Sequence, residues 1–344
     1  MCHFRTVLAL LSLGVPLYAF AQTPVQSFKD ISPESSYYQA AEYLKSAGIV
    51  GGYSDGTFKP DTKVERGAAL KMVLGAIMKP EQLAGITTTS FTDIPASTWY
   101  LPYAETARRL GIVDGPPKAS GFNGMKSVRN AEFLKMYLKA QGVNVQTAFS
   151  DITLPLSVDA ADSSAWFFPS LRFAITSSMV MAGKDGTFDL SKELTRGDVA
   201  LLMFRYAMYK QGRRTQALLS EEESEIVALM QHLEKKDLKA AEFASARAIL
   251  AARGAIVSKP SVPLVQGAMK TAEGFRALVE GYKAGTEGRL ADAIQLSSKA
   301  WALAAKAKQF SASLDAVTTQ MQTIAKNIAD QARALEKLPT VKAQ

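Results

Sequence analysis

Hydrophobic residues recur at helical spacing in two parts of the chain, separated by short polar or glycine-containing stretches. In the first part, runs such as residues 40–45 and 103–108 have this spacing and end near Gly48 and Gly111. Glycine is favoured just after a helix because it accepts the left-handed backbone found there. From residue 220 onward, longer runs rich in alanine and leucine indicate long helices. The pattern predicts a mainly all-α protein.

The first part of the chain is a threefold repetition. Residues 28–31, 91–94 and 149–152 read FKDI, FTDI and FSDI, and each is followed by aromatic residues and a short helical pattern. A loop comes next, and Asp-Gly-Thr-Phe stands in it at residues 55–58 and again at 185–188. Aspartate and glycine favour a tight turn there. Second helices are expected after the loops, at residues 67–78, 131–139 and 199–209. The repetition predicts tandem helix–loop–helix units.

The repeats differ in detail. We expect the opening phenylalanines in the core and their aspartates at helix caps. The third repeat carries a nine-residue insertion between Asp151 and Trp166. In the second repeat the helix start reads Ser-Val-Arg-Asn-Ala, with Glu132 one place late. Ser36 stands in the first repeat where the others have tryptophan. An arginine occurs at all three helix starts, as Arg66, Arg129 and Arg196.

This pattern resembles the S-layer homology (SLH) domain. Residues 48–60, GIVGGYSDGTFKP, match the Gly-Tyr-x-Asp-Gly-x-Phe-x-Pro loop of that family, and residues 194–198, LTRGD, match its Thr-Arg-Ala-Glu helix start. The resemblance covers three repeats, at residues 28–80, 91–140 and 149–209. It implies a pseudo-threefold bundle whose grooves bind anionic, often pyruvylated, cell-wall polysaccharide. Such grooves tether secreted proteins to the envelope.

The resemblance directs attention to arginine, tryptophan and lysine side chains. An arginine at a helix start pairs with a carboxylate through its planar fork, and the helix dipole favours the anion. A tryptophan offers a flat face to a sugar ring. The glycan-binding candidates are Arg66, Arg129, Arg196, Trp99, Trp166 and Lys184. The alternative is structural: tryptophans packed between repeats and arginines in salt bridges between repeats. A calcium site is disfavoured because the loops lack spaced oxygen ligands and a closing glutamate.

Residues 1–21 are typical of a secretory signal peptide. Basic residues precede an apolar run at 7–18, which is too short to span a bilayer, and Ala-Phe-Ala at 19–21 resembles a cleavage site. An uncleaved anchor is the alternative. Cys2 lies inside this segment, so the mature chain would have no disulfide, zinc thiolate or thiol nucleophile. We expect an exported cell-envelope protein without a transmembrane segment.

The net charge of +8 favours acidic partners such as anionic glycans, nucleic acids or membrane surfaces. The basic residues are spread thinly, and the densest stretch, residues 210–214, contains no aromatic residue. Nucleic-acid binding is therefore disfavoured, and an anionic cell-wall polysaccharide is the expected partner.

The last third of the chain is expected to be a linker, residues 210–219, and a helical domain, residues 220–338. Ser220 followed by three glutamates is typical of a helix N-cap with acids in the first turn. Residues 236–241 and 288–293 are alike. Residues 278–282 together with 288–294 resemble a degenerate tetratricopeptide-like hairpin, although a plain helical bundle is favoured.

The final helix, expected at residues 311–338, is amphipathic and could pack on the other helices or join a coiled coil. Trp301 is expected in the core. These helices are predicted to contact a protein partner or a second copy of the chain.

The sequence shows no catalytic, metal-binding or cofactor-binding set. His232 is the only histidine after the predicted signal peptide, and no Ser/His/Asp set or phosphate-binding loop is present. We predict a non-enzymatic envelope protein. One alternative is a scaffold of degenerate repeats, with Trp99 and Trp166 buried. Another is an enzyme with a carboxylate-lined pocket in the C-terminal helices.

Overall fold

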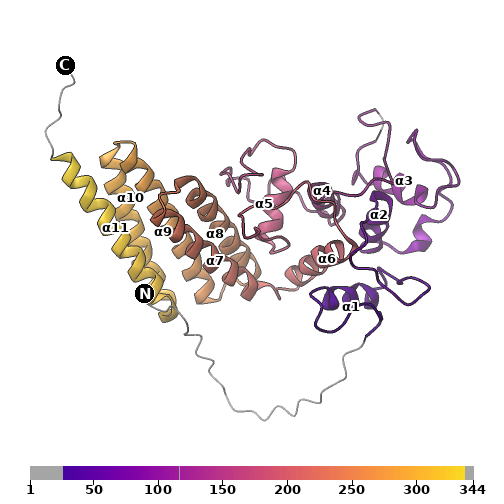
Figure 1. Ribbon diagram of the computed structural model, residues 1–344, viewed down its shortest axis with the longest axis horizontal. Coiled ribbons are helices and arrows are strands. Elements are labelled where there is room, and N and C mark those ends of the chain that lie inside the picture. The colour runs from indigo at the N-terminus through magenta and orange to yellow at the C-terminus, as the bar shows by residue number, and fades with distance from the viewer. Residues whose placement is uncertain (1–25, 116, 338–344) are drawn as a thin grey trace, which may run out of the picture.

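The computed structural model describes residues 26–115 and 117–337, so the predicted signal peptide lies outside the described residues. Throughout this part of the chain the regular elements are helices, and extended segments pair only as isolated bridges. The prediction of a mainly all-α fold is confirmed. Short helices and long loops form one part of the molecule, and a row of longer helices, α7 to α11, forms the other (Figure 1).

Each repeat contributes two helices joined by a loop. Their bounds are α1 (Tyr38–Ser46) and α2 (Arg66–Gly75), α3 (Leu101–Arg109) and α4 (Asn130–Ala140), and α5 (Phe168–Thr176) and α6 (Arg196–Lys210). A short 3-10 helix, Pro80–Leu83, lies between the first two repeats. Gly48 and Gly111 have φ values of 71° and 69° at the ends of α1 and α3, as their positions in the sequence predict. Ser178 takes the same left-handed conformation after α5, with φ of 54°.

The three repeats close into a ring through their extended segments. The amide of Val64 donates to the carbonyl of Leu194 at 2.9 Å, and the amide of Val128 donates to the carbonyl of Val64 at 2.9 Å. The amide of Leu194 completes the ring by donating to the carbonyl of Val128 at 3.0 Å. One residue from each repeat therefore gives and receives one bond, which is the pseudo-threefold arrangement that the resemblance implied.

The opening aspartates hold the loops instead of capping helices, so the expected capping role is wrong. Asp30 accepts hydrogen bonds from the amides of Phe58 and Lys59 at 2.8 and 2.7 Å. Asp93 accepts from the amides of Phe122 and Asn123, both at 2.7 Å. A carboxylate that accepts two backbone bonds fixes the turn that places the loop phenylalanine in the core.

In the third repeat, Asp159 performs this task and Asp151 does not. Asp159 accepts from the amide of Phe188 at 3.2 Å, whereas Asp151 pairs with Arg253 of the C-terminal part at 2.6 Å. The spacing from Asp159 to Trp166 is close to that from aspartate to tryptophan in the second repeat. The insertion therefore lies between Asp151 and the loop-holding Asp159, which narrows its expected place between Asp151 and Trp166.

The first helices anchor the start of each repeat with a charged residue at one shared position. Glu42 of α1 accepts from the amide of Ser27 at 2.8 Å, and Glu105 of α3 accepts from that of Ser90 at 3.2 Å. Arg108 lowers the pKa of Glu105 to about 2. Arg172 of α5 stands at this position in the third repeat. It reverses the polarity by donating to the carbonyls of Ile152 and Val145 at 3.1 Å.

The different roles of Asp159 and Asp151 can be tested by measuring the free energy of unfolding. Replacing Asp159 with asparagine is expected to lower the free energy of unfolding by about 1–2 kcal/mol, because charge-assisted bonds to the loop amides are lost. Asp151→Asn removes a surface ion pair and is expected to cost less than about 1 kcal/mol. Urea unfolding of both variants would compare them, and an equal or larger loss for Asp151→Asn would contradict the assignment.

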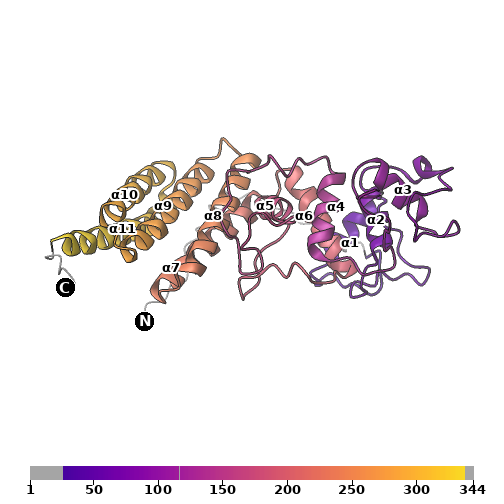
Figure 2. The ribbon, with the colours of Figure 1, turned by 90° about the horizontal axis from the view of Figure 1, so that it is seen from above.

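The second part of the molecule is built from helical hairpins. Its helices are α7 (Thr215–Glu234), α8 (Leu238–Ser258), α9 (Pro263–Thr286), α10 (Leu290–Phe310) and α11 (Asp315–Glu336), with a 3-10 turn, Ala312–Leu314, before the last. Each helix packs on the next, and α7 and α11 also contact α9. Figures 1 and 2 show a stacked row instead of a closed bundle. The two similar sequence stretches, 236–241 and 288–293, begin α8 and α10, the second helices of two hairpins.

The expected linker at residues 210–219 is mostly helix. α7 begins at Thr215, so Ser220 lies inside it and the predicted N-cap at Ser220 is wrong. Arg214 hydrogen-bonds the hydroxyl and carbonyl of Ser178, and its guanidinium lies 3.5 Å from Glu221. Glu221, expected in the first turn of a helix, instead helps to tie α7 to the third repeat.

A second set of contacts joins α8 to the third repeat. Arg247 forms an ion pair with Glu225 of α7 at 2.7 Å and donates to the carbonyl of Leu156 at 2.7 Å. Gly254 lies against the C-terminal carbonyl of α5, because a Cβ added there would stand 1.8 Å from the carbonyl oxygen of Thr176. The row of helices therefore continues directly from the repeats.

Trp301 is 46% exposed on α10, so its expected place in the core is wrong. The buried face of α10 is instead lined by alanines, among them Ala300 and Ala304. Across the described residues, no helix combines the length and hydrophobicity that a membrane span requires.

Candidate functional site

Three equivalent junctions form where the second helix of one repeat begins against the loop of another. We name them the 1–2 junction at the start of α2, the 2–3 junction at the start of α4, and the 3–1 junction at the start of α6. The amides of Arg66, Asn130 and Arg196 each donate to a loop carbonyl of the neighbouring repeat, at 2.8, 2.9 and 2.9 Å. These bonds make Arg66, Asn130 and Arg196 equivalent.

Arg129 is therefore displaced by one residue from the predicted alignment. It is the N-cap of α4, the place that Glu65 holds before α2 and Thr195 before α6. Glu132 is the third residue of α4 and accepts from the amide of Arg129 at 3.1 Å. It is not late, because Asp198 occupies the same place in α6. The equivalence of Arg129 with Arg66 and Arg196 is wrong.

Arg66 and Arg196 lie against aromatic rings of the neighbouring loops. The guanidinium carbon of Arg66 is 5.2 Å from the ring centre of Phe122, and its Nη1 is 3.9 Å from Glu132. That of Arg196 is 4.8 Å from the ring of Phe58 and 5.4 Å from the ring of Tyr53. Burial lowers the pKa of both arginines. Cation–π contacts of this kind help to hold neighbouring repeats together.

The two candidate tryptophans lie at the surface of different junctions. Trp99 is 50% exposed in the 1–2 junction and Trp166 is 55% exposed in the 2–3 junction. The ammonium group of Lys71 lies 5.9 Å from the Trp99 ring, and that of Lys135 lies 5.4 Å from the Trp166 ring. The burial of both tryptophans that a pure scaffold predicts is therefore wrong.

The position after each equivalent residue must be small. A Cβ on Gly67 would lie 2.8 Å from the ring of Tyr100, and one on Gly197 would lie 2.8 Å from the ring of Tyr37. Sequence reasoning singled out neither glycine. Tyr37 also donates to Asp198 at 3.3 Å, so the ring is fixed at both ends.

Two of the predicted site residues meet in one pocket. Arg129 and Trp166 line a cavity of about 520 Å³ in the 2–3 junction, together with Glu132 and Phe167. The pocket thus combines an exposed cation with an aromatic face. Lys184 is exposed on the third loop and is not among the residues that line this cavity.

Comparisons with known proteins agree with this geometry. The profile of the S-layer homology domain matches residues 27–70 and 90–122. The chain is 28% identical over 120 residues to an uncharacterized cell wall amidase of Bacillus anthracis, an alignment that covers 33% of this chain and 22% of that protein.

A second relative is the Surface-layer 125 kDa protein of Lysinibacillus sphaericus. It is 24% identical over 201 residues, which is 56% of this chain and 16% of that protein. The alignments thus span less than a quarter of either relative. The third repeat lies outside the segments matched by the profile, although it contributes a helix pair, a loop and one residue of the ring. Residues 27–70 and 90–122 thus match the S-layer homology domain.

Proposed function

We propose that the three repeats tether this protein to an anionic cell-wall polysaccharide and that the protein is not an enzyme. The observation that carries the proposal is the pair of half-exposed tryptophans, each with a lysine beside its ring at a junction between repeats. A tryptophan face can stack on a sugar ring, and a lysine next to it can pair with a carboxylate. The net charge of +8 favours an anionic glycan over a neutral one.

The three junctions differ in what they offer to such a glycan. The 1–2 junction combines Trp99 with Lys71, and the 2–3 junction combines Trp166 with Lys135 and Arg129. In the 3–1 junction the tryptophan position is Ser36, and Arg196 is enclosed by loop aromatics. We therefore assign glycan binding to the first two junctions and a structural role to the third.

The match to the S-layer homology domain and the similarity to a surface-layer protein support a position at the cell surface. There the row of helices would extend away from the anchored repeats (Figure 2). Trp301 is exposed on this row and gives it an aromatic contact for a protein partner or for a second copy of the chain.

Co-sedimentation of the full chain with purified cell-wall sacculi tests the anchor. Removing the wall polysaccharide with acid is expected to abolish binding. Trp99→Ala and Trp166→Ala are each expected to weaken binding about tenfold, since stacking on an aromatic face contributes about 1–1.5 kcal/mol. The double variant should lose nearly all binding.

Trp301→Ala is the matched control, because it removes a tryptophan of similar exposure from the helical row. It should bind sacculi like the parent chain. Unchanged binding of the double variant, or equal binding to stripped sacculi, would reject the glycan anchor. In that case the repeats would act as a scaffold, and the helical row would carry the binding function.

A further inference from the structure

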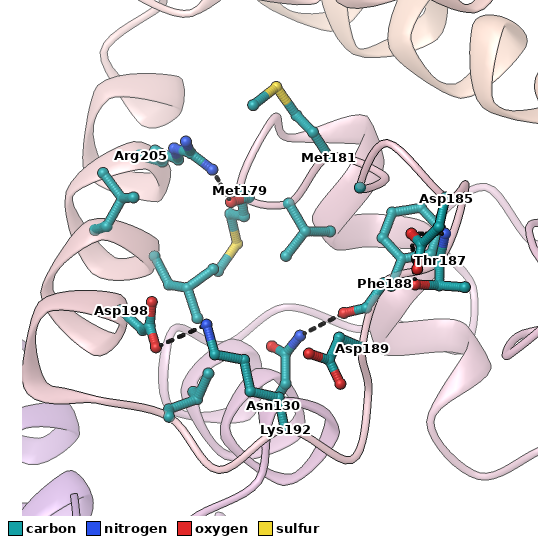
Figure 3. A pocket seen from close by; sticks show the side chains of 15 residues that line it. Asn130, Met179, Met181, Asp185, Thr187, Phe188, Asp189, Lys192, Asp198 and Arg205 are labelled. Atoms are coloured by element: carbon teal, nitrogen blue, oxygen red, sulfur yellow. Dashed lines mark hydrogen bonds and ion pairs between the residues drawn. The ribbon is translucent and has the colours of Figure 1, made fainter. Parts of the chain in front are cut away.

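A second pocket lies in the 2–3 junction, beside the one that Trp166 lines. It measures about 570 Å³ and lies between the start of α4, the third loop and α6 (Figure 3). Its wall includes Asn130, Phe188, Asp198 and Leu202, and neither Trp166 nor Arg129 lines it. It adjoins the pocket assigned above to the glycan, and the two share only Thr187 and Asp189 in their linings.

The 3–1 junction explains why this space is open. There the guanidinium of Arg196 fills the equivalent position, between the rings of Phe58 and Tyr53 and with Nη1 4.0 Å from the sulfur of Met72. In the 2–3 junction, Asn130 replaces this arginine and Gly183 replaces the tyrosine. Two large groups are missing at once, whereas the loop phenylalanine is kept.

The 1–2 junction shows the same preference for a cation. The guanidinium of Arg66 lies over Phe122 and 3.9 Å from Glu132. Phe188 and Asp198 are the counterparts of Phe122 and Glu132, and both line the open pocket. Two of the three junctions thus place a guanidinium where the third has only space, an aromatic face and a carboxylate.

One buried acceptor in the pocket, the Oδ1 of Asn130, lacks a donor. Asn130 is 8% exposed, and its Nδ2 donates to the carbonyl of Phe188 at 3.0 Å. Its Oδ1 has no hydrogen-bond partner among the described residues, although a buried acceptor of this kind normally has one. Figure 3 shows this oxygen directed into the pocket, on the same side as the Nζ of Lys192.

The charges around the pocket are mixed, with an excess of acid. Asp185, Asp189 and Asp198 line it, against Lys192 and Arg205. Arg205 is engaged by the carbonyl of Met179 at 3.0 Å, whereas Lys192, which pairs with Asp198 at 3.2 Å, is 43% exposed. An exposed lysine can turn into solvent and leave Asp198 to an incoming cation.

We propose that this pocket binds a guanidinium group from outside the chain, such as the arginine side chain of a partner peptide. The group would stack on Phe188, pair with Asp198 and donate to the Oδ1 of Asn130. A guanidinium suits these partners better than an ammonium, because it is planar and donates in several directions. An amino sugar would supply the same positive charge as an ammonium, and the test separates the two sources.

Titration calorimetry at low salt, with the full chain, tests the assignment. The probes are N-acetylarginine amide, its neutral counterpart N-acetylcitrulline amide, and glucosamine. The arginine compound is expected to bind at least tenfold more tightly than the other two. Equal binding of the citrulline compound would overturn the role of charge, and tighter binding of glucosamine would overturn the choice of guanidinium.

Two variants locate the site. Asn130→Arg restores the residue found in the other junctions and should fill the pocket, lowering affinity for the arginine compound at least tenfold. Asp189→Asn should weaken binding about threefold, and it places asparagine in the left-handed conformation that Asn123 adopts at the equivalent position. Asp61→Asn, an equal charge change on the first loop, is the control and should bind like the parent.

A thermal melt of Asn130→Arg checks that the chain remains folded. If that variant is unfolded, Asp189→Asn against Asp61→Asn still decides the question. Unchanged affinity in a folded Asn130→Arg protein would overturn the proposal. None of these titrations contains wall glycan, so their result is independent of the sacculus experiment.

Discussion

Replacing Gly254 with alanine is expected to lower the free energy of unfolding by about 3 kcal/mol, the upper part of the range for overpacked cores. The added Cβ would lie 1.8 Å from the carbonyl oxygen of Thr176 and 2.9 Å from its carbonyl carbon. Both atoms belong to backbone in packed helices, so neither can move aside as a flexible side chain would. α8 must then move away from α5.

Gly285→Ala provides the matched control, because Gly285 also lies in a long helix but has only the Cβ of Ala293 nearby, at 3.8 Å. It should raise stability by about 0.5–1 kcal/mol through the helix propensity of alanine. Urea unfolding of both variants measures the difference. A Gly254→Ala protein as stable as the parent would show that α8 does not pack this tightly on the third repeat.

Glu222→Met is expected to stabilise the protein, and more so as the pH rises. Glu222 is buried in α7, its Oε1 has no hydrogen-bond partner among the described residues, and burial followed by repulsion from Glu223 raises its pKa well above 4.5. The folded chain thus holds a proton that the unfolded chain releases above about pH 4.5. The wild-type protein therefore loses stability as the pH rises from 4.5 toward the folded pKa.

The loss amounts to about 1.4 kcal/mol for each pH unit in that window, and methionine does not titrate. Unfolding free energies of parent and variant at pH 4, 6 and 8 should diverge accordingly. Glu223→Gln, the exposed neighbour, removes only the smaller of the two causes and should therefore keep most of the pH dependence. A constant difference between Glu222→Met and parent at all three pH values would show that Glu222 is ionised in the fold.

The repeats could be predicted from the sequence because their local signals agree with their tertiary roles. Gly48 and Gly111 mark helix ends through a backbone conformation that few residues accept. The loop phenylalanines Phe58 and Phe188 are buried, as an apolar residue directly after a tight turn indicates. Each signal depends on a few neighbouring residues, and sequence patterns report such short-range requirements well.

The prediction for the third repeat was wrong because two aspartates, Asp151 and Asp159, could each have been the one that holds the loop. Asp151 carries the Phe-x-Asp-Ile sequence, yet Asp159 receives the loop amides. Only the distance to residues 188–190 separates them, and the sequence does not contain that distance. The predicted alignment of Arg129 with Arg66 and Arg196 was wrong for the same reason. Backbone hydrogen bonds between repeats decide which residue begins the helix.

The C-terminal helices were found, but the exposure of their side chains was not. Alanine-rich helices pack closely through small residues, so large side chains such as Trp301 can remain outside while Ala300 and Ala304 are buried. Glu222 is the reverse case, an acid on the buried face of α7 between Leu218 and Ile226. Hydrophobic pattern alone favours the opposite placement in both cases.

The candidate site was partly accessible to sequence reasoning. The pocket that joins Arg129 and Trp166 contains two residues that the resemblance had singled out. The second pocket could not be predicted, because it results from what is missing at Asn130 and Gly183. An absent side chain becomes visible only when equivalent junctions can be compared in space.

The hydrogen-bonded ring also sets the order in which the molecule can mature. Beside Val64, Lys63 reaches the carbonyl of Glu193, a partner 130 positions later in the chain. A ribosome releases the first repeat long before this partner exists, so its extended segment must wait for the third repeat. Contacts of such long sequence separation slow folding. The first repeat therefore lacks its ring hydrogen bonds to the third repeat until the third repeat has been synthesised.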